Sequence, residues 1–325
     1  MTLEKHFIWT ISSGIDRIDL SSMKRGDVLK HVVVAGASSF LAGHLLPMLS
    51  GKYRVTGLSR RLGEVVCSGI DYAQLELANY DQFSKIVSSC DIYVPFIWAG
   101  TKREERASEQ VNEASFHAVM ESVRQAIAQG CQKIILPGTC AEFANDGQPI
   151  DEETAYRPDT PYGRWKQQLY QETKKLCADT GTHFLCLRMF SVYGSDDRRD
   201  KMINSIWGKL CAGASVEMTE GLQLWSFLHV DDAARAFLLA VESEDLSDGC
   251  YNLAATEHRR LRDFVEEMRE AANSSSEICY GAVPYADGKI PHTLFLSRKA
   301  GSIFSWQPKI SFSEGIRRMK DANRM

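Results

Sequence analysis

The stretch that decides the fold is residues 31–43, which read HVVVAGASSFLAG. Residues 31–35 form an apolar run of strand length, Gly36 permits a sharp turn, and residues 42–49 have the apolar spacing of a helix that packs on a sheet. A helix that begins directly after such a turn presents free backbone N–H groups, and these can bind a pyrophosphate. The stretch therefore predicts the first strand, turn and helix of a dinucleotide-binding sheet.

This turn is poor in glycine. A dinucleotide fingerprint usually has three glycines, and here only Gly36 stands in register, while Ser39 and Ala42 occupy the two later places. Small side chains still let the backbone approach phosphate, and the Ser39 hydroxyl can donate to it. An ordinary turn between a strand and a helix is the alternative when the stretch is taken alone. The residues expected to contact a cofactor here are Gly36, Ser38, Ser39, Phe40 and Leu41.

Segments of strand length alternate with segments of helix length from about residue 30 to residue 195, which predicts an α/β fold with a doubly wound parallel sheet, a Rossmann fold. The expected strands are 31–35, 54–59, 92–98, 133–136 and 183–188, and the expected helices are 42–49, 81–88, 104–129 and 161–179. We expect an N-terminal extension over 1–28, the Rossmann domain over 29–195 and a smaller α/β substrate lobe over 196–325, with some segments of the lobe returning to the Rossmann domain. Within the lobe, Asp231 and Asp232 are expected to cap a helix over 233–241.

Composition excludes several classes of protein. The 325 residues are 44% hydrophobic and 25% charged, as in an ordinary globular protein, and the net charge of −4 provides no basic field for nucleic acid or an anionic membrane. No apolar run approaches the roughly 20 residues of a membrane span. The nine cysteines form no metal-ligand pattern with the eight histidines, so we expect reduced thiols, no metal site and a cytoplasmic protein.

The end of the second expected strand carries Ser59-Arg60-Arg61, about 20 residues after the glycine turn. An NAD enzyme usually places an acidic residue there, against the ribose 2′-hydroxyl. Two guanidinium groups at this point suit a 2′-phosphate instead, because their planar donors match phosphate oxygens. The pair therefore favours NADP(H) over NAD(H), with a solvated pair of surface arginines as the alternative.

The strongest local signal is the sequence TPYGRWK at residues 160–166. Thr160 can cap a helix that Pro161 opens, and this helix places Tyr162 and Lys166 one turn apart on one face. A phenol with an ordinary pKa near 10 exchanges protons slowly at neutral pH, but a neighbouring ammonium stabilises the phenolate. Tyr162 is thus a candidate general acid or base; the alternative is a packed tyrosine beside an exposed lysine.

Further motifs give these signals a context. They are GTCAEF at 138–143, LRMFSVYG at 187–194, FLHVDD at 227–232, YNLA at 251–254 and FSWQPKISFSEGI at 304–316. With the glycine turn and YGRWK, the chain resembles an extended short-chain dehydrogenase/reductase of the nucleotide-sugar epimerase/dehydratase family over nearly everything after residue 30. The resemblance implies a catalytic set of Thr139, Tyr162 and Lys166, a C-terminal lobe that binds a nucleoside diphosphate sugar, and a homodimer. It also implies cofactor contacts from Trp98, Ala99, Val192 and Lys166.

Departures from the family pattern narrow the reaction. The 4,6-dehydratases have an Asp-Glu pair directly after the catalytic Thr, where this chain has Cys140 and Ala141, so dehydration is not expected. Cys140 is either a second acid or base or a small packed thiol, and Glu142 beside it is more typical of a hydrogen-bonded structural acid than of a catalyst.

The substrate side departs from the pattern as well. Ser191 stands where the family usually has an Asn for the substrate diphosphate, and Trp225 stands where the family usually has an Arg before the FLHVDD motif. Arg198 and Arg199 are candidates to supply the missing charge, with a solvated loop pair as the alternative.

Together these observations predict an NADPH-dependent reductase of a 4-keto-deoxysugar nucleotide. In that reaction Thr139 orients the reacting oxygen, Tyr162 delivers the proton, and Lys166 holds the ribose and tunes Tyr162. One alternative is a nucleotide-sugar 4-epimerase with tightly bound NAD(H). Another, from a different class, is a non-catalytic NAD(P)-binding scaffold.

Overall fold

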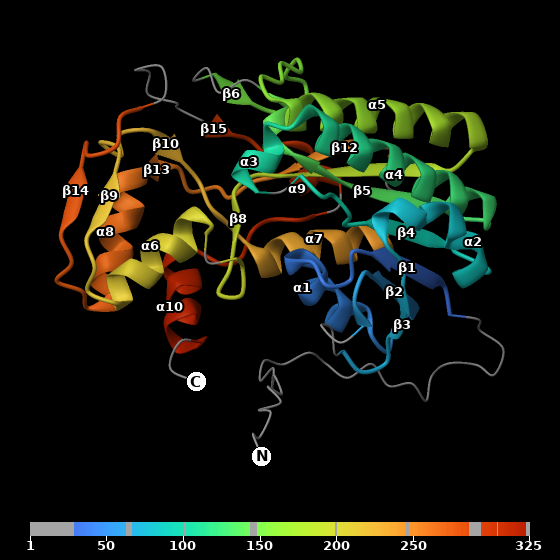
Figure 1. Ribbon diagram of the computed structural model, residues 1–325, viewed down its shortest axis with the longest axis horizontal. Coiled ribbons are helices and arrows are strands. Elements are labelled where there is room, and N and C mark those ends of the chain that lie inside the picture. The colour runs from blue at the N-terminus through green and yellow to red at the C-terminus, as the bar shows by residue number, and fades with distance from the viewer. Residues whose placement is uncertain are drawn as a thin grey trace.

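A seven-stranded parallel sheet forms the centre of the molecule (Figure 1). The computed structural model describes residues 29–62, 67–100, 102–143, 148–198, 200–244, 247–285, 294–303 and 305–322. The sheet order is β12-β7-β5-β4-β1-β2-β3, so the order reverses beside β1, and ligands of doubly wound folds bind at the carboxyl ends of strands at such a point. The strands are β1 (His31–Ala35), β2 (Arg54–Ser59), β3 (Asp71–Gln74), β4 (Ile92–Pro95), β5 (Lys133–Thr139), β7 (His183–Met189) and β12 (Gly249–Leu253).

Helices cover both faces of this sheet, because its strands are apolar on both sides. Val32 and Val34 of β1 face one core, which also contains residues of α1 and α7, whereas Val33 and Ala35 face the core beneath α4 and α5. The helices of the first face are α1 (Phe40–Leu49), α7 (Val230–Glu242) and α9 (Lys299–Ile303). Those of the second are η3 (Leu77–Gln82), α2 (Phe83–Ile86), α4 (Glu109–Ala128) and α5 (Pro161–Thr180), with α3 (Arg103–Arg106) and η4 (Cys140–Glu142) near the ends of β4 and β5.

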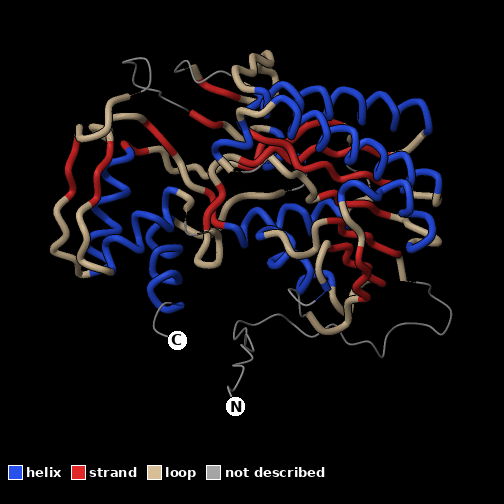
Figure 2. Tube along the Cα trace, in the orientation of Figure 1, coloured by secondary structure: helices blue, strands red, loops and turns tan. Residues whose placement is uncertain are grey.

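A smaller lobe lies beside the sheet, on the left of Figures 1 and 2, and has its own core of aromatic and aliphatic side chains from α6, α8 and α10. Its short strands form two-stranded pairs instead of a continuous sheet. The lobe and its connections contain β8 (Val192–Tyr193), α6 (Met202–Cys211), β9 (Val216–Met218), β10 (Leu224–Trp225), β11 (Leu228–His229), β13 (Arg259–Arg260), α8 (Leu261–Ala272), β14 (Ile278–Tyr280) and α10 (Phe312–Ala322). A further pair, β6 (Pro149–Ile150) with β15 (Leu294–Phe295), lies above the sheet in Figure 1.

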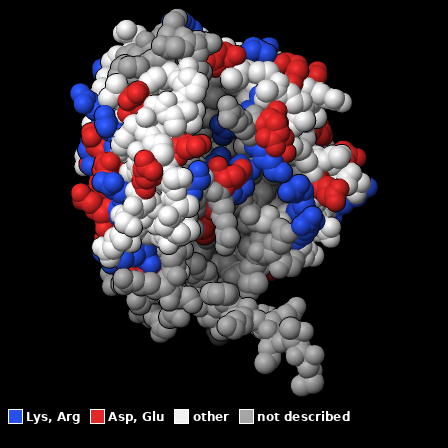
Figure 3. Space-filling model, turned by 60° about the vertical axis from the view of Figure 1, so that its left-hand side comes forward, with Lys and Arg blue, Asp and Glu red and all other residues white. Residues whose placement is uncertain are grey.

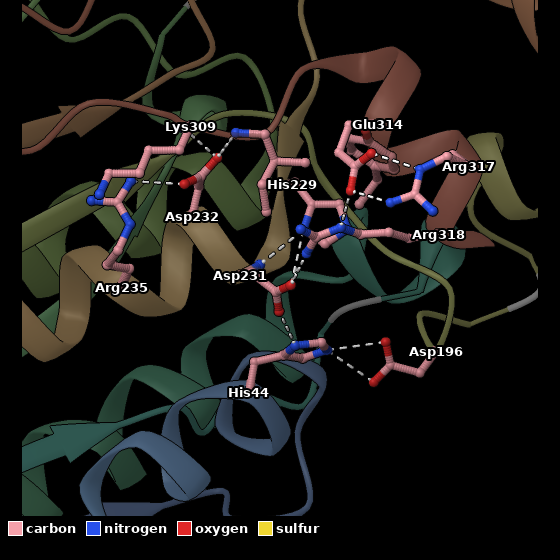
Figure 4. A network of polar contacts seen from close by, with 12 residues as sticks. His44, Asp196, His229, Asp231, Asp232, Arg235, Lys309, Glu314, Arg317 and Arg318 are labelled. Carbon is pink, nitrogen blue, oxygen red and sulfur yellow. Dashed lines mark hydrogen bonds and ion pairs between the residues drawn. The ribbon is translucent and has the colours of Figure 1, made fainter. Parts of the chain in front are cut away.

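A polar network, drawn in Figure 4, joins the two parts of the molecule. His44 of α1 contacts Asp231 of α7 through Nδ1 at 2.6 Å and Asp196 of the loop after β8 through Nε2 at 3.0 Å. Arg318 of α10 donates to the other oxygen of Asp231 at 2.8 Å. We call these four residues the His44 clasp. It ties the first helix of the sheet to a loop and a helix of the lobe.

The expected fold class is confirmed, with several local corrections. The prediction of one helix over 104–129 is wrong, because the structure has two helices there, α3 and α4. The Ser108 hydroxyl caps α4 by accepting from Val111 N at 3.3 Å. The expected strand 92–98 ends at Pro95, and the helix expected over 81–88 occupies 77–86 as η3 and α2. Finally, His229, not Asp231 or Asp232, caps α7. The carboxylate of Asp232 instead accepts from the backbone N–H groups of residues 309 and 310.

Segments from beyond residue 196 do return to the sheet. β12 supplies its edge strand next to β7, and α7 packs against α1. The expected extension over 1–28 lies outside the described residues. None of the helices in the described ranges is long and apolar enough to cross a membrane.

Candidate active site

The turn after β1 is built for close approach of backbone. Gly36 has a φ of 78°, and a Cβ at this position would lie 2.2 Å from the carbonyl oxygen of Phe96, so only glycine fits. The N–H groups of Gly36 and Ala37 both donate to Leu58 O at 2.9 Å, which fixes the turn against the end of β2. A dinucleotide phosphate fits this cradle, because the next backbone N–H groups belong to the first turn of α1.

Ser39 is the N-cap of α1, and Phe40 and Leu41 are its first residues, so the helix begins two residues earlier than expected. The Ser39 hydroxyl oxygen accepts from Ala42 N at 3.4 Å, and its hydrogen remains a donor that can serve a phosphate. Ser38 accepts from the Ser59 hydroxyl at 3.1 Å, so the glycine turn and the end of β2 are directly bonded. Arg60 and Arg61 follow at once and are exposed, at the place where the adenosine ribose is expected.

Thr139 and Tyr162 are brought together by a contact between η4 and α5. The Thr160 hydroxyl caps α5 by accepting from Gly163 N at 3.1 Å, as predicted. A Cβ on Gly163 would lie 2.0 Å from Ala141 O, so glycine lets the first turn of α5 pack directly on η4. Thr139 ends β5 and forms a side-chain hydrogen bond with Tyr162. The two residues predicted to handle the reacting oxygen and proton are therefore adjacent.

Lys166 is buried one turn further along α5. Its Nζ donates to Pro137 O at 2.7 Å and lies 4.9 Å from the centre of the Trp98 ring, and that ring meets the Tyr162 ring edge to face at 6.0 Å. Burial lowers the pKa of Lys166, while the Glu142 carboxylate opposes that change. The Trp98 ring thus contacts both Lys166 and Tyr162, so Trp98 lines the candidate site as well as packing against the core. Ala99 follows it and is exposed, with its N–H bonded to Ser115 Oγ at 3.1 Å.

The electrostatics of Tyr162 differ from the expectation. Burial raises the pKa of its phenol, and the largest opposing effects come from the Arg106 guanidinium and from the hydrogen bond with Thr139. Lys166 was expected to tune Tyr162, but it is bound to Pro137 O instead. A raised pKa keeps the phenol protonated at neutral pH, which is the state that a proton donor needs.

Glu142 is a structural acid, as its position beside the site suggested. It is fully buried, and its Oε2 accepts from Arg188 Nε at 3.0 Å while its Oε1 accepts from Thr139 N at 2.9 Å. Arg188 also donates to Asn252 at 3.0 Å and to the Tyr156 hydroxyl at 2.7 Å. The ion pair between Glu142 and Arg188 therefore fixes the end of β5 at Thr139. Both charged groups also form further hydrogen bonds, as a buried ion pair requires.

Cys140 lies beside Tyr162 and packs against an apolar cluster that includes Phe143 and Phe295. Burial raises the pKa of its thiol, although the Arg106 charge opposes that change. A neutral, packed thiol is the form that this environment favours.

The remaining candidate residues lie between the sheet and the lobe. Ser191 joins β7 to β8 with a φ of 48°, in the left-handed region, and its carbonyl accepts from Leu228 N at 3.2 Å. Val192 follows in β8, paired with Leu228. Trp225 in β10 places its ring 6.0 Å from that of Phe295, and its buried Nε1 has no hydrogen-bond partner among the described residues. Arg199 lies outside the described residues, whereas Arg198 forms an ion pair with Asp200 at 3.2 Å.

Three further residues of the site were not found by sequence reasoning: Arg106, Asn112 and Lys201. The Arg106 guanidinium lies 4.9 Å from the centre of the Tyr162 ring. Burial and the nearby Arg106 charge lower the pKa of Lys201, at the start of α6. No motif marks these residues, because Arg106 lies far in the sequence both from Tyr162 and from Lys201. Figure 3 shows a hollow on this side of the molecule with Lys and Arg side chains at its floor and Asp and Glu at its rim. Within the described residues, no His, Cys, Asp and Glu side chains gather as a metal site.

The fold is that of a Rossmann-type enzyme with a dinucleotide-binding sheet, and the comparisons agree. The chain belongs to the NAD dependent epimerase/dehydratase family, whose model matches residues 32–254. The predicted resemblance is thus confirmed, and the chain is an enzyme of an NAD-dependent family.

Relatives and solved structures are similar over most of the chain. CDP-abequose synthase of Salmonella muenchen is 22% identical over 301 residues, which cover 90% of this chain and 98% of that protein. Putative UDP-arabinose 4-epimerase 2 of Arabidopsis thaliana is 23% identical and matches 77% of this chain and 69% of its own length. Among solved structures, UDP-glucose 4-epimerase of Thermotoga maritima with UDP-glucose has a TM-score of 0.81 at 17% identity, over 90% of this chain and 98% of its own.

Proposed function

We propose that this protein catalyses the NADPH-dependent reduction of a 4-keto group on a nucleotide-activated deoxysugar. The observation that carries the proposal is the end of β2, where two exposed arginines follow Ser59 and no carboxylate stands between Ser59 and Leu62. Such an end suits a cofactor with a 2′-phosphate. A cofactor that exchanges freely supports net reduction of the substrate, whereas a 4-epimerase returns its hydride to the sugar.

The catalytic steps of this chain follow from the geometry. The bound dinucleotide supplies a hydride to the carbonyl carbon. Thr139 holds the carbonyl oxygen beside the Tyr162 hydroxyl, and Tyr162 donates its proton to that oxygen as negative charge develops there. Lys166, fixed by Pro137 O, holds the ribose of the cofactor. The neutral Cys140 and the apolar Ala141 leave the site without the acid and base pair that dehydration needs.

The relatives support a nucleoside diphosphate sugar as the substrate. Two curated relatives are CDP-abequose synthases and others are UDP-sugar epimerases, so a nucleoside diphosphate sugar is the shared class of ligand. Ser191, Trp225 and Arg198 are the residues of the described chain that we assign to its nucleotide and diphosphate, together with Arg199. Lys201 adds positive charge on the same side.

The second candidate function is a 4-epimerase with tightly bound NAD(H), because solved epimerases share this fold and two of those similar to this chain were solved with NAD. It uses the same Thr139, Tyr162 and Lys166. The scaffold without turnover is contradicted by membership of an enzyme family. The reductase and the epimerase are therefore distinguished by their cofactor and not by the residue that transfers the proton.

Cofactor preference tests the proposal directly. The wild type and the double variant Arg60→Ala/Arg61→Ala are titrated with NADPH and with NADH. Each charged hydrogen bond that is lost costs about 1.5–3 kcal/mol, so NADPH binding weakens by at least tenfold while NADH binding is unchanged. Equal losses for both cofactors, or preference of the wild type for NADH, contradict the 2′-phosphate assignment.

Two further assignments belong to this proposal. All nine cysteines are free, five of them buried, which suits the reducing cytoplasm.

A homodimer through α4 and α5, which pack side by side, stays a prediction. Equilibrium sedimentation of the purified chain measures it.

A further inference from the structure

The short helix α3 is held in place by one buried side chain. Asn112 of α4 is fully buried, and its Nδ2 donates to the carbonyl groups of Glu105 at 3.0 Å and Ser108 at 2.7 Å. Its Oδ1 accepts from Trp98 Nε1 at 2.9 Å. A Cβ on Gly100 would lie 2.5 Å from this same oxygen, so the chain between β4 and α3 passes the amide as closely as glycine allows. The amide therefore fixes the backbone of α3 and the ring of Trp98 together.

This anchoring determines where Arg106, the last residue of α3, can reach. Its guanidinium lies over the Tyr162 ring, 4.9 Å from the ring centre, within the range of a cation–π contact. Lys166, the other cation near the phenol, is turned toward Pro137 O and the Trp98 ring. Among the described residues, no carboxylate forms an ion pair with Arg106. Glu109, the acid nearest in sequence after it, instead binds Arg164 and Trp165.

We propose that Arg106 is a positioning residue for the acid Tyr162: it holds the phenol ring against Trp98 and stabilises the negative charge that remains on the ring after the proton has left. A cation–π contact strengthens when the ring becomes an anion, so Arg106 favours the product state of the proton transfer. The role rests on the proposed acid function of Tyr162, but it can be measured without any substrate.

The charges that face Tyr162 come from every element packed around it. Arg106 from α3 and the Thr139 hydroxyl from β5 lower the pKa of the phenol, whereas Cys140 and Glu142 from η4 raise it. Lys166 lies on the same helix, and Lys201 of the lobe faces Arg106. Burial is the largest effect and raises the pKa. Removal of the Arg106 charge should therefore raise the pKa of the phenol further and make the phenol a weaker acid.

The test is a titration of Tyr162 itself. A fluorinated tyrosine is incorporated at position 162, because its fluorines bring the phenol into a pH range that the protein tolerates, and its ionisation is followed by fluorine NMR in the enzyme without substrate. Arg106→Gln should decrease the ionisation constant about tenfold, the effect of one nearby opposite charge. Arg106→Lys should restore most of it. Arg164→Gln is the matched control, since Arg164 is exposed, two residues from Tyr162, and paired with Glu109 at 3.0 Å.

The outcomes are distinct. An increase in the pKa of the fluorophenol in Arg106→Gln alone, smaller at high salt because Arg106 is exposed, supports the role. An unchanged titration, or an equal shift in Arg164→Gln or Arg106→Lys, overturns it. Because no substrate is present, failure of the reductase proposal leaves this result unaffected. With a turned-over substrate, Arg106→Gln should lower kcat about tenfold and leave the cofactor Kd unchanged.

Discussion

The two sides of the site differ in how their buried polar atoms are bonded. On the Rossmann side, Thr139, Glu142 and Lys166 each have a partner within the protein. On the lobe side, four buried atoms of the described chain have neither a hydrogen bond nor an ion pair: Asn204 Oδ1, Trp207 Nε1, Trp225 Nε1 and Ser226 Oγ. The sheet side has three such atoms, in His31, Tyr72 and Tyr93, and none of them belongs to the predicted catalytic set. Buried polar groups without partners are rare in folded proteins and mark places for a ligand or water. The predicted catalytic residues are therefore bonded within the protein, whereas the lobe side keeps buried polar atoms that are open to a ligand or water.

The largest expected effect lies on the Rossmann side. Tyr162→Phe keeps the ring, its contact with Trp98 and the cation–π contact, but deletes the proton donor. Turnover should fall by roughly 10² to 10⁴, the loss typical of a general acid, while cofactor affinity and thermal stability persist. Tyr170→Phe, a buried tyrosine on the same helix, is the control and should retain activity. Full activity of Tyr162→Phe would remove this residue from the mechanism.

The buried ion pair beneath Thr139 gives the next effect. Glu142→Gln leaves the Arg188 charge without its counter-ion, in a place where Arg188 is 1% exposed. Denaturant titration should show a loss of about 3–5 kcal/mol in the free energy of unfolding. Glu109→Gln breaks an exposed pair with Arg164 and should cost less than about 1 kcal/mol. Equal costs for the two variants would mean that the buried pair does not hold the end of β5.

The His44 clasp makes the contact between the two sides dependent on pH. Hydrogen bonds and charges of Asp196 and Asp231 outweigh burial and raise the pKa of His44 from 6.5 to about 9. A folded pKa above the unfolded one means that the stabilisation is complete below pH 6.5 and is lost as the pH rises through 9. The free energy of unfolding of the wild type should exceed that of His44→Gln by about 1–2 kcal/mol at pH 6, a value that allows for solvent screening at this partly exposed site. The difference between the two proteins should shrink above pH 9. A difference that is constant with pH would show that the histidine is not charged.

The smallest effect tests the lobe side. Trp225→Phe keeps an aromatic ring beside Phe295 but removes the unpartnered N–H, so the substrate KM should rise roughly 2–10-fold, as for one neutral hydrogen bond. Stability and cofactor affinity should not change. Trp306→Phe is the opposite case, because Trp306 Nε1 already donates to Asp232 O at 2.9 Å, and it should lower stability without changing KM. A stability loss in Trp225→Phe would mean that its N–H has a partner in the free protein.

The same contrast explains what the sequence could predict. Tyr162 and Lys166 lie on one helix with a clear cap, so their spacing alone places them on one face. The end of β5 places Thr139 beside them, because parallel strands end at a common edge. Strand β3 was missed because it is a partly exposed edge strand without an apolar run.

Arg106 was missed for a different reason. It acts across the fold, from a four-residue helix whose position is set by Asn112, and no local pattern encodes such a contact. The pairing of Glu142 with Arg188 is similarly distant in the chain. Local spacing therefore predicts that Thr139, Tyr162 and Lys166 lie near one another, whereas the contacts around them come from tertiary packing.

Isotope transfer tests the central claim most directly. The enzyme is incubated separately with 4-keto-6-deoxy nucleotide sugars and with nucleotide sugars that carry a hydroxyl at C4, each with NADPH that carries deuterium at its transferable C4 position, and the products are analysed by mass spectrometry and NMR. Reduction predicts one deuterium at C4 of the sugar for each NADPH oxidised, and no transfer in Tyr162→Phe at comparable times. Conversion of a nucleotide sugar into its C4 epimer without net oxidation of NADPH and without deuterium in the product would contradict the reductase and establish the epimerase.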